Sequence, residues 1–151
     1  AMLKASRRRS VILFKAADEE HFAVPQEKVQ RLERLLAAQI QKVGDKEFMQ
    51  YRNEGLPLVR LDRHMQVRPI PKGLEELYVI IPKCTGTRGG IPAAGILIST
   101  ILDAVDVDTE LKPAEIRGTG LLGSAMVNDH LTLFLDPDPL LLAETQASEA
   151  K

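Results

Sequence analysis

The chain has 151 residues, 44% of them hydrophobic, and its 20 lysines and arginines almost balance its 21 aspartates and glutamates. This length and composition suit one globular domain, or two small ones that share an interface. The balanced charge and the absence of tryptophan argue against nucleic-acid binding and against electrostatic attraction to a membrane surface.

Residues 1–10 are expected to lie outside the folded domain. Ala1 and Met2 are typical of a cloning remnant, and the three arginines between Ser6 and Ser10 are typical of the end of a linker. A basic recognition patch is the less favoured interpretation of so short a run. No apolar stretch approaches the roughly 20 residues of a membrane helix, and the first residues lack a signal-peptide core.

Two short strands are predicted next. Val11–Phe14 is apolar, Asp18–Glu20 is a charged turn, and His21–Val24 is a second apolar run before Pro25, which is the pattern of a hairpin. The segment that follows is ambiguous, because the spacing of its apolar residues by three and four, over residues 29–40, favours an amphipathic helix.

A polar turn at residues 52–55 separates two further strand-like runs, Lys46–Tyr51 and Leu56–Asp62. Asn53 suits such a turn because asparagine tolerates positive φ. Arg52, at the tip of the turn, is either a solvated arginine or a bidentate partner for a carboxylate on a neighbouring protein.

A connector with two prolines, residues 66–73, divides the chain into two halves, 11–68 and 74–143, which can share strands. In the second half, Leu77–Ile81 is a β-rich run that is too short for a typical helix.

The single cysteine, Cys84, opens a glycine-rich loop, Cys84–Gly90. A lone cysteine excludes an internal disulfide and fits a reducing compartment such as the cytoplasm. Only three residues separate Cys84 from Arg88, fewer than a tyrosine-phosphatase loop requires, and the lysine of a nucleotide-binding loop is missing. The histidines, which lack the spacing of a zinc site, are His21, His64 and His130. We expect no catalytic residue, no metal and no cofactor, and a small-ligand sensor or enzyme that uses this loop is the alternative from a different functional class.

The most regular pattern lies near the end of the chain. Apolar and polar residues alternate over 124–127 and 130–135, on either side of Asn128–Asp129, which predicts a hairpin with a two-residue turn. Prolines then stop the sheet, and Asp138 is predicted to cap a short helix that begins at Pro139.

The run Gly120–Ala125, followed by this hairpin and by Leu133–Asp136, resembles the closing segment of CheW-like domains, in particular the regulatory domain at the C-terminal end of the CheA chemotaxis histidine kinase. Phe22–Pro25 and Leu111–Pro113 resemble other segments of the same family, and Ala94–Asp103 resembles one of its strands, which implies a single strand there. The similarity extends in the family's order over Val11 to Leu142.

Two positions depart from the family pattern, because Asn53 stands where most relatives have glycine and Ser99 replaces the usual aspartate. The resemblance favours a strand, not a helix, for Val29–Leu35. It also implies an all-β fold with one or two short helices, in which two SH3-like five-stranded β-barrel subdomains lie side by side over residues 11–143, followed by a flexible tail, 144–151.

By the same resemblance, the chain is a non-catalytic scaffold and regulatory domain of a chemotaxis-type signalling kinase, or a standalone CheW-type adaptor. Its partners would be a CheW-type adaptor, the cytoplasmic tip of a chemoreceptor and the remaining domains of the kinase, and its location the cytoplasm beside membrane-bound receptor arrays. In this family an arginine that precedes the strand at Leu56 helps to form the coupling surface. The resemblance thus makes Arg52, with Asn53 and Glu54, the candidate partner-binding residues.

Overall fold

The structure is a computed structural model that describes residues 8–83 and 94–149, with side chains as far as Glu144. Its strands are β1 (Arg8–Lys15), β2 (His21–Pro25), β3 (Val29–Leu36), β4 (Gln41–Val43), β5 (Lys46–Tyr51), β6 (Glu54–Arg60), β7 (Glu76–Pro82), β8 (Gly95–Ile98), β9 (Thr100–Asp108), β10 (Leu121–Val127) and β11 (His130–Leu135). The helical elements are the short 3-10 turns η1 (Gln26–Lys28), η2 (Ala37–Gln39) and η3 (Leu61–Arg63), and the helix α1 (Pro137–Glu149).

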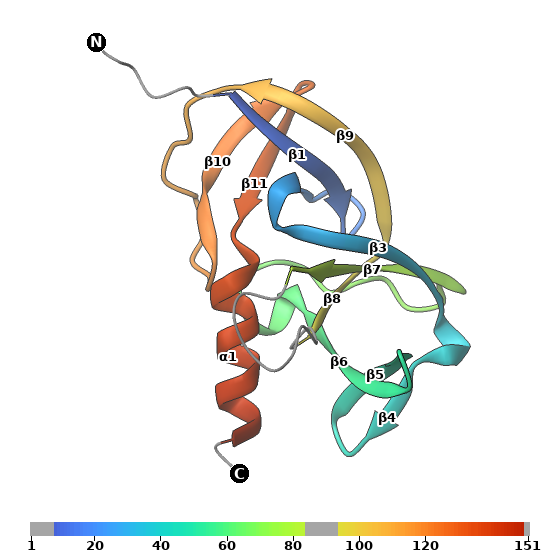
Figure 1. The fold of residues 1–151 in the computed structure, drawn as a ribbon. Helices are drawn as coiled ribbons and strands as arrows, with labels where there is room; N and C mark the ends of the chain where they lie inside the picture. Colours follow the sequence, from blue (N-terminus) through green and yellow to red (C-terminus); the bar gives the residue numbers. More distant parts are fainter. Residues whose placement is uncertain (1–7, 84–93, 150–151) are drawn as a thin grey trace.

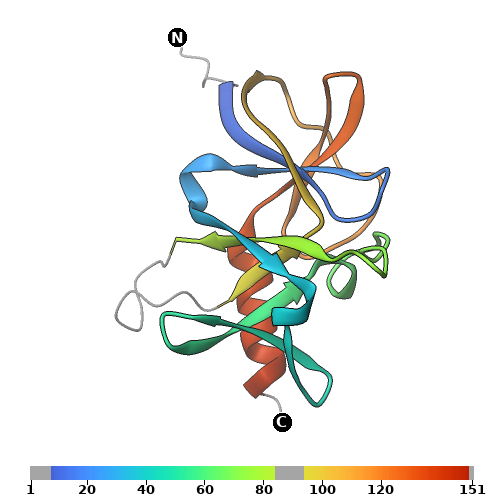
Figure 2. The ribbon, with the colours of Figure 1, turned by 90° about the vertical axis from the view of Figure 1, so that its right-hand side faces the viewer.

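The strands form two sheets, as the resemblance implied. One sheet has five strands in the order β10-β11-β2-β1-β9, and the other has six in the order β3-β7-β8-β6-β5-β4. In Figure 1 the five-stranded sheet occupies the upper half and the six-stranded sheet the lower half, while α1 runs from the end of β11 down one side of the molecule. Figure 2 shows the same division from a second direction. The predicted mostly-β architecture is confirmed.

The two sheets exchange strands between the halves of the sequence. The N-terminal β1 and β2 pair with C-terminal strands, whereas β7 and β8 pair with strands from the first half. Each sheet also includes a parallel pairing, of β6 with β8 and of β11 with β2. β6 and β11 are each the second strand of a hairpin with a two-residue turn, and each leads into a helical element. The two subdomains are therefore built from the same local arrangement of elements.

β3 forms where the apolar spacing alone favoured a helix, so the strand interpretation is confirmed. It pairs with β7 in antiparallel register from Val29 to Leu36. β7 is an apolar strand with buried residues at most positions, and its backbone N–H and C=O groups require a hydrogen-bonded neighbour. The pairing with β7 therefore outweighs the helical period of the β3 sequence.

The prediction of a single strand over Ala94–Asp103 is wrong, because this run forms two strands that belong to different sheets. The break falls at Ser99, between β8 and β9. The Ser99 N–H and hydroxyl both donate to the carbonyl oxygen of Lys15, each over 2.9 Å. These two bonds anchor the point at which the chain passes from one sheet to the other.

α1 begins earlier than predicted and is longer. Its first residue is Pro137, and the Asp136 Oδ1 accepts a hydrogen bond from the N–H of Asp138 at 3.1 Å. Asp136, not Asp138, therefore caps the helix, with a proline at the first helical position where no N–H is needed. The helix continues to Glu149, into the segment expected to be a flexible tail.

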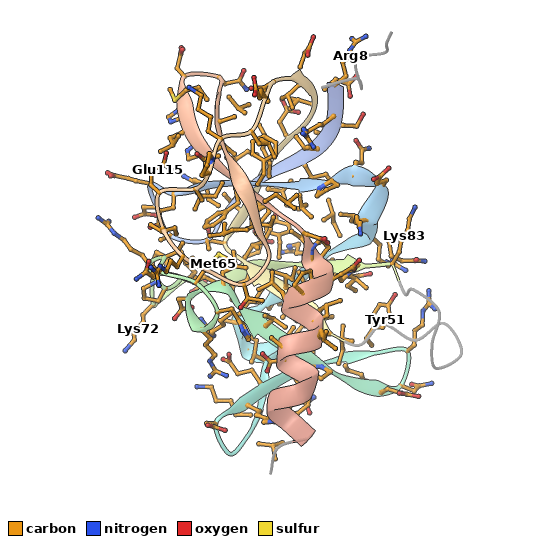
Figure 3. All side chains as sticks on the ribbon, turned by 90° about the vertical axis from the view of Figure 1, so that its left-hand side faces the viewer. Arg8, Tyr51, Met65, Lys72, Lys83 and Glu115 are labelled. Carbon is orange, nitrogen blue, oxygen red and sulfur yellow. The ribbon has the colours of Figure 1, made fainter. Side chains whose placement is uncertain are left out.

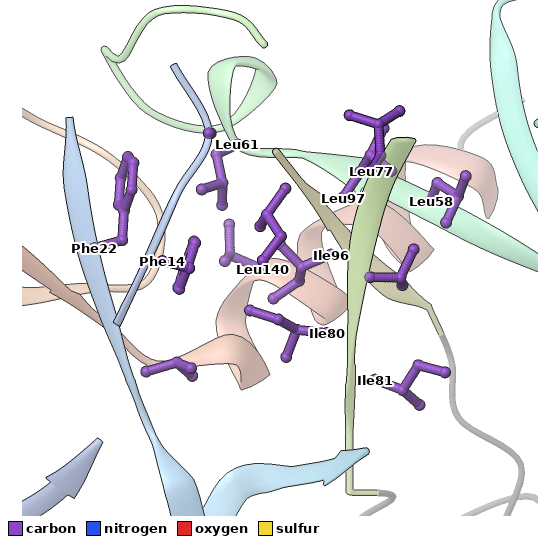
Figure 4. Close-up of a cluster of buried hydrophobic side chains, with 14 of the residues drawn as sticks. Phe14, Phe22, Leu58, Leu61, Leu77, Ile80, Ile81, Ile96, Leu97 and Leu140 are labelled. Carbon is purple, nitrogen blue, oxygen red and sulfur yellow. The ribbon is translucent and has the colours of Figure 1, made fainter. Parts of the chain in front are cut away.

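Two apolar clusters hold the sheets together. The larger lies where β1, β2, β7, β8 and α1 meet (Figure 4), and the Phe14 and Phe22 rings within it stack with centroids 5.3 Å apart. The smaller packs within the five-stranded sheet and contains Val11, Leu13, Ala23, Ala125, Val127 and Phe134. Because alternate residues of β1 enter different clusters, β1 is buried on both faces and links the two cores.

Candidate docking surfaces

The three residues predicted to bind a partner lie together at the tip of the β5–β6 hairpin. Arg52 and Asn53 form its two-residue turn, with φ of 51° and 64°, and Glu54 pairs with Tyr51 in the register of the two strands. Two successive positive φ values are typical of the turn whose twist matches that of the flanking strands. All three predicted residues are exposed, so the fold presents their side chains to solvent.

Arg52 occupies an unfavourable backbone conformation for an arginine. The left-handed region costs a residue with a Cβ about 1 kcal/mol, except for asparagine and aspartate, which enter it more readily. The Arg52 guanidinium lies 5.1 Å from the centre of the Tyr51 ring, a cation–π contact that offsets part of this cost. The opposite hairpin, β10–β11, instead places Asn128 and Asp129 at its two positive-φ positions.

The Tyr51 side chain lies directly beneath the Arg52 guanidinium. Its ring is buried, and its hydroxyl has no hydrogen-bond partner among the described residues. Figure 3 places Tyr51 well away from Arg8, the first residue of the five-stranded sheet's β1. The Arg52 turn is therefore backed by a buried aromatic ring of the six-stranded sheet.

A second candidate surface lies on the β10–β11 hairpin. Met126 and Leu131 face each other in the antiparallel register, and 61% and 51% of their surfaces are exposed. Directly paired residues lie on the same side of a ladder, so the two side chains form one apolar patch, here called the hairpin patch. The sequence alternation groups Leu131 with Leu133 and Leu135 but Met126 with Ser124, so only the structure shows that the two paired residues face solvent together.

Two of the three histidines lie together in the structure. His21 on β2 and His130 on β11 stack with ring centroids 4.1 Å apart, although 109 positions separate them in the chain. His64 lies elsewhere, with its Nε2 at 2.9 Å from the Glu144 Oε1 on α1. No pattern in the sequence indicates either contact, since each depends on the packing of elements that are distant in the chain.

A buried ion pair supports the six-stranded sheet. The Arg60 Nε and Nη2 donate to the two carboxylate oxygens of Glu47, at 2.6 and 3.0 Å, and Glu47 is only 7% exposed. Hydrogen bonding from Arg60 lowers the pKa of the Glu47 carboxyl against the opposing effect of burial, and the charge of Arg60 lowers it further. The period of two on β5 places Glu47 on the same face as Met49 and Tyr51, which is the one sequence signal for its burial.

The described residues offer no constellation for catalysis. No three histidine, cysteine, aspartate or glutamate side chains among them gather as a metal site requires. No helix in this part of the chain is long and apolar enough to cross a membrane. Ser124 is buried within β10, and its hydroxyl donates to Glu115 over 3.3 Å. The loop Cys84–Gly90, on which the enzyme or sensor alternative depends, lies outside the described residues.

Comparisons with known proteins agree with this architecture. Among 15 matching chains of solved structures is the scaffolding protein TtCheW from Thermoanaerobacter tengcongensis, which has a TM-score of 0.65 and 17% sequence identity and aligns over 84% of this chain and 88% of its own. At that identity the likeness concerns the fold. No curated protein sequence matches the chain. The family model for the CheW-like domain matches residues 10–145. The chain thus belongs to the CheW-like family, which comprises non-catalytic scaffold domains of chemotaxis signalling.

Proposed function

We propose that this domain couples a chemotaxis-type histidine kinase to a CheW-type adaptor and to the cytoplasmic tip of a chemoreceptor by docking at its surfaces. The observation that carries the proposal is the exposed turn of Arg52, Asn53 and Glu54, in which an arginine is kept in a costly conformation. Backbone strain that the surrounding structure maintains is often associated with function. The domain works in the cytoplasm, beside membrane-bound receptor arrays.

Docking at the Arg52 turn has a simple physical basis. A guanidinium can form two parallel hydrogen bonds with a partner carboxylate, and the Tyr51 ring restricts the guanidinium before the partner arrives. This restriction reduces the side-chain entropy lost on binding. Neighbouring Asn53 and Glu54 add polar groups that suit the rim of a protein interface.

Two versions of this function differ in the protein that carries the domain. The sequence resemblance to the C-terminal domain of CheA supports a regulatory domain of the kinase, which is our first proposal. The likeness to the scaffolding protein TtCheW supports a standalone adaptor as the second candidate. A standalone adaptor should restore receptor control to a kinase that lacks its own adaptor, and a kinase domain should not.

Sedimentation velocity tests the docking proposal directly. The domain is run alone, with the CheW-type adaptor of the same genome, and with a receptor-tip fragment, at concentrations up to about 100 μM, where weak complexes are populated. Arg52→Ala should weaken association roughly tenfold while the domain stays folded. An unchanged dissociation constant would remove Arg52 from the interface.

Arg52→Gly provides a matched control for strain. Glycine enters the left-handed region freely, so this variant should be as stable as the natural domain or more stable, yet should bind as weakly as Arg52→Ala. If Arg52→Gly binds normally, the guanidinium has no role in docking and the turn is only structural. If the natural domain sediments as a monomer with every partner, the coupling function itself is wrong.

A further inference from the structure

The seam between β2 and β11 carries a feature that docking alone does not explain. These strands pair in parallel over only three register positions, Thr132 with His21, Leu133 with Phe22, and Phe134 with Ala23. The seam joins the β10–β11 hairpin to the N-terminal strands. At its open end the His21 and His130 rings stack at 4.1 Å, with an angle of 15° between their planes.

The environment of His21 disfavours positive charge. His21 is partly buried and lies opposite Lys15 of β1 in the strand register. Burial lowers the pKa of His21 below 6.5, and the charges of His130 and Lys15 lower it further, in that order. His130 and Lys15 are thus the titratable groups that act on His21 from the two strands packed against it. The Lys15 carbonyl is fixed by its two hydrogen bonds from Ser99, which restricts how far this end of β1 can move away.

The pair is also close to the hairpin patch. Leu131 directly follows His130, and Val127 pairs with His130 one step along the ladder from the Met126 and Leu131 pair. The imidazole rings and the apolar side chains lie on opposite faces of the hairpin, since neighbouring residues of a strand alternate. A change in the position of His130 therefore moves the backbone that carries Leu131.

We propose that the stacked His21 and His130 form a pH-sensitive switch, in which acidification separates the two rings, loosens the β2–β11 seam and weakens docking at the hairpin patch. This inference rests on the proposed docking function. Two imidazolium rings in this stack would repel each other, and Lys15 adds a third positive charge on the same side.

The direction of the effect follows from proton linkage. The pKa of His21 is lower in the folded state than in the unfolded state, so His21 binds fewer protons when folded, and its neutral form contributes its full stability above about pH 6.5. That contribution is lost as the pH falls through the folded-state pKa. The seam should therefore be closed at neutral pH and open more often in acid.

Amide hydrogen exchange of the free 151-residue chain tests the switch without any partner. After correction for the intrinsic pH dependence of exchange, protection of the β11 amides at Leu131–Phe134 should fall at least fivefold between about pH 7.5 and 5.5, within the usual range of coupling between sites. Amides of β7, which lies in the other sheet, should not respond. His130→Phe keeps a ring against His21 but cannot be protonated, so it removes the repulsion between the two rings and should reduce the change, while the burial of His21 and the charge of Lys15 remain.

His64→Gln is the matched control, because it removes a histidine that does not contact the stack, and its β11 amides should respond to acid as the natural chain does.

A second arm measures adaptor binding at both pH values for the natural chain and for His130→Phe, so that titration of the adaptor cancels in the ratio. The natural chain should lose about fivefold more affinity in acid than His130→Phe. Equal acid responses of the two chains in β11 exchange would overturn the switch, whether or not the adaptor binds. If the adaptor does not bind at pH 7.5, the docking function is contradicted. The exchange result still tests whether the β2–β11 seam opens in acid.

Discussion

Glu47 shows how a single residue can combine stability with pH dependence. Glu47→Gln removes the charge that Arg60 binds through two hydrogen bonds, and it leaves a largely buried guanidinium without its partner. The free energy of unfolding should fall by about 2 kcal/mol, below the range for fully buried pairs because Arg60 is partly exposed. Chemical denaturation at pH 7 measures the change. Glu33→Gln, which breaks a pair with the half-exposed Arg31, should cost less than about 1 kcal/mol.

The same pair predicts how stability depends on pH. The pKa of Glu47 lies below its ordinary value of 4.5 in the folded chain, so the folded state binds fewer protons than the unfolded state. The stabilisation is present above about pH 4.5 and is lost as the pH falls through the folded-state pKa. Denaturation midpoints measured from pH 6 to pH 3 should fall more steeply for the natural chain than for Glu47→Gln. Parallel curves would show that the pair is not the source of acid sensitivity.

Gly120, the first glycine of the Gly-Leu-Leu-Gly run, occupies a position where the backbone requires glycine. Its φ is +85°, and a Cβ built there would lie 2.8 Å from the carbonyl oxygen of Asp136. Gly120→Ala should therefore destabilise the fold by about 2 kcal/mol. Gly55→Ala is the control, since a Cβ there would meet Phe48 at an ordinary 3.7 Å, and its effect should stay within about 0.5 kcal/mol. Thermal denaturation of both variants makes the comparison, and equal midpoints would contradict it.

At the scale of elements, α1 is part of the core and not an appendage. Leu140 is fully buried, whereas Leu142, two residues further along the same helix, is 59% exposed. Leu140→Ala should cost about 3 kcal/mol because it leaves a cavity between the sheets, and Leu142→Ala less than about 0.5 kcal/mol. The two variants have the same helix propensity, so a similar loss of stability in both would mean that α1 is not anchored as described. Urea denaturation resolves the difference.

Elements were predictable from sequence where local chemistry alone decides them. Asn128 and Asp129 determined the β10–β11 turn, and the apolar runs of β1, β2 and β7 appear where alternation and turn residues placed them. The periodicity of the sequence could not predict β3 or the break at Ser99. β3 forms because β7 needs a hydrogen-bonded neighbour, and the break depends on the hydrogen bonds of Ser99 to the Lys15 carbonyl. The histidine stack likewise depends on a contact between strands that are distant in the sequence.

At the scale of the whole molecule, the two candidate surfaces lie far apart. The Arg52 turn belongs to the six-stranded sheet and the hairpin patch to the five-stranded sheet, in the lower and upper halves of Figure 1. A domain with two separate docking surfaces can engage two partners at once, and two different surfaces used together produce rings or chains of molecules. Weak individual contacts suffice for such assemblies because each bound partner raises the effective concentration for the next.

This arrangement predicts how variants change the size of the complex, not only its affinity. With adaptor in excess, the natural domain should form species larger than one-to-one, whereas Arg52→Ala and Met126→Ser should each stop at one-to-one. The double variant should bind roughly as weakly as the two single losses combined, since the sites share no residues. Val43→Ser, which alters a 68% exposed residue on β4 outside both surfaces, should assemble normally. Multi-angle light scattering gives the masses, and full-size complexes with Met126→Ser would show that the hairpin patch is not a docking surface, leaving the Arg52 turn as the single site of the proposal.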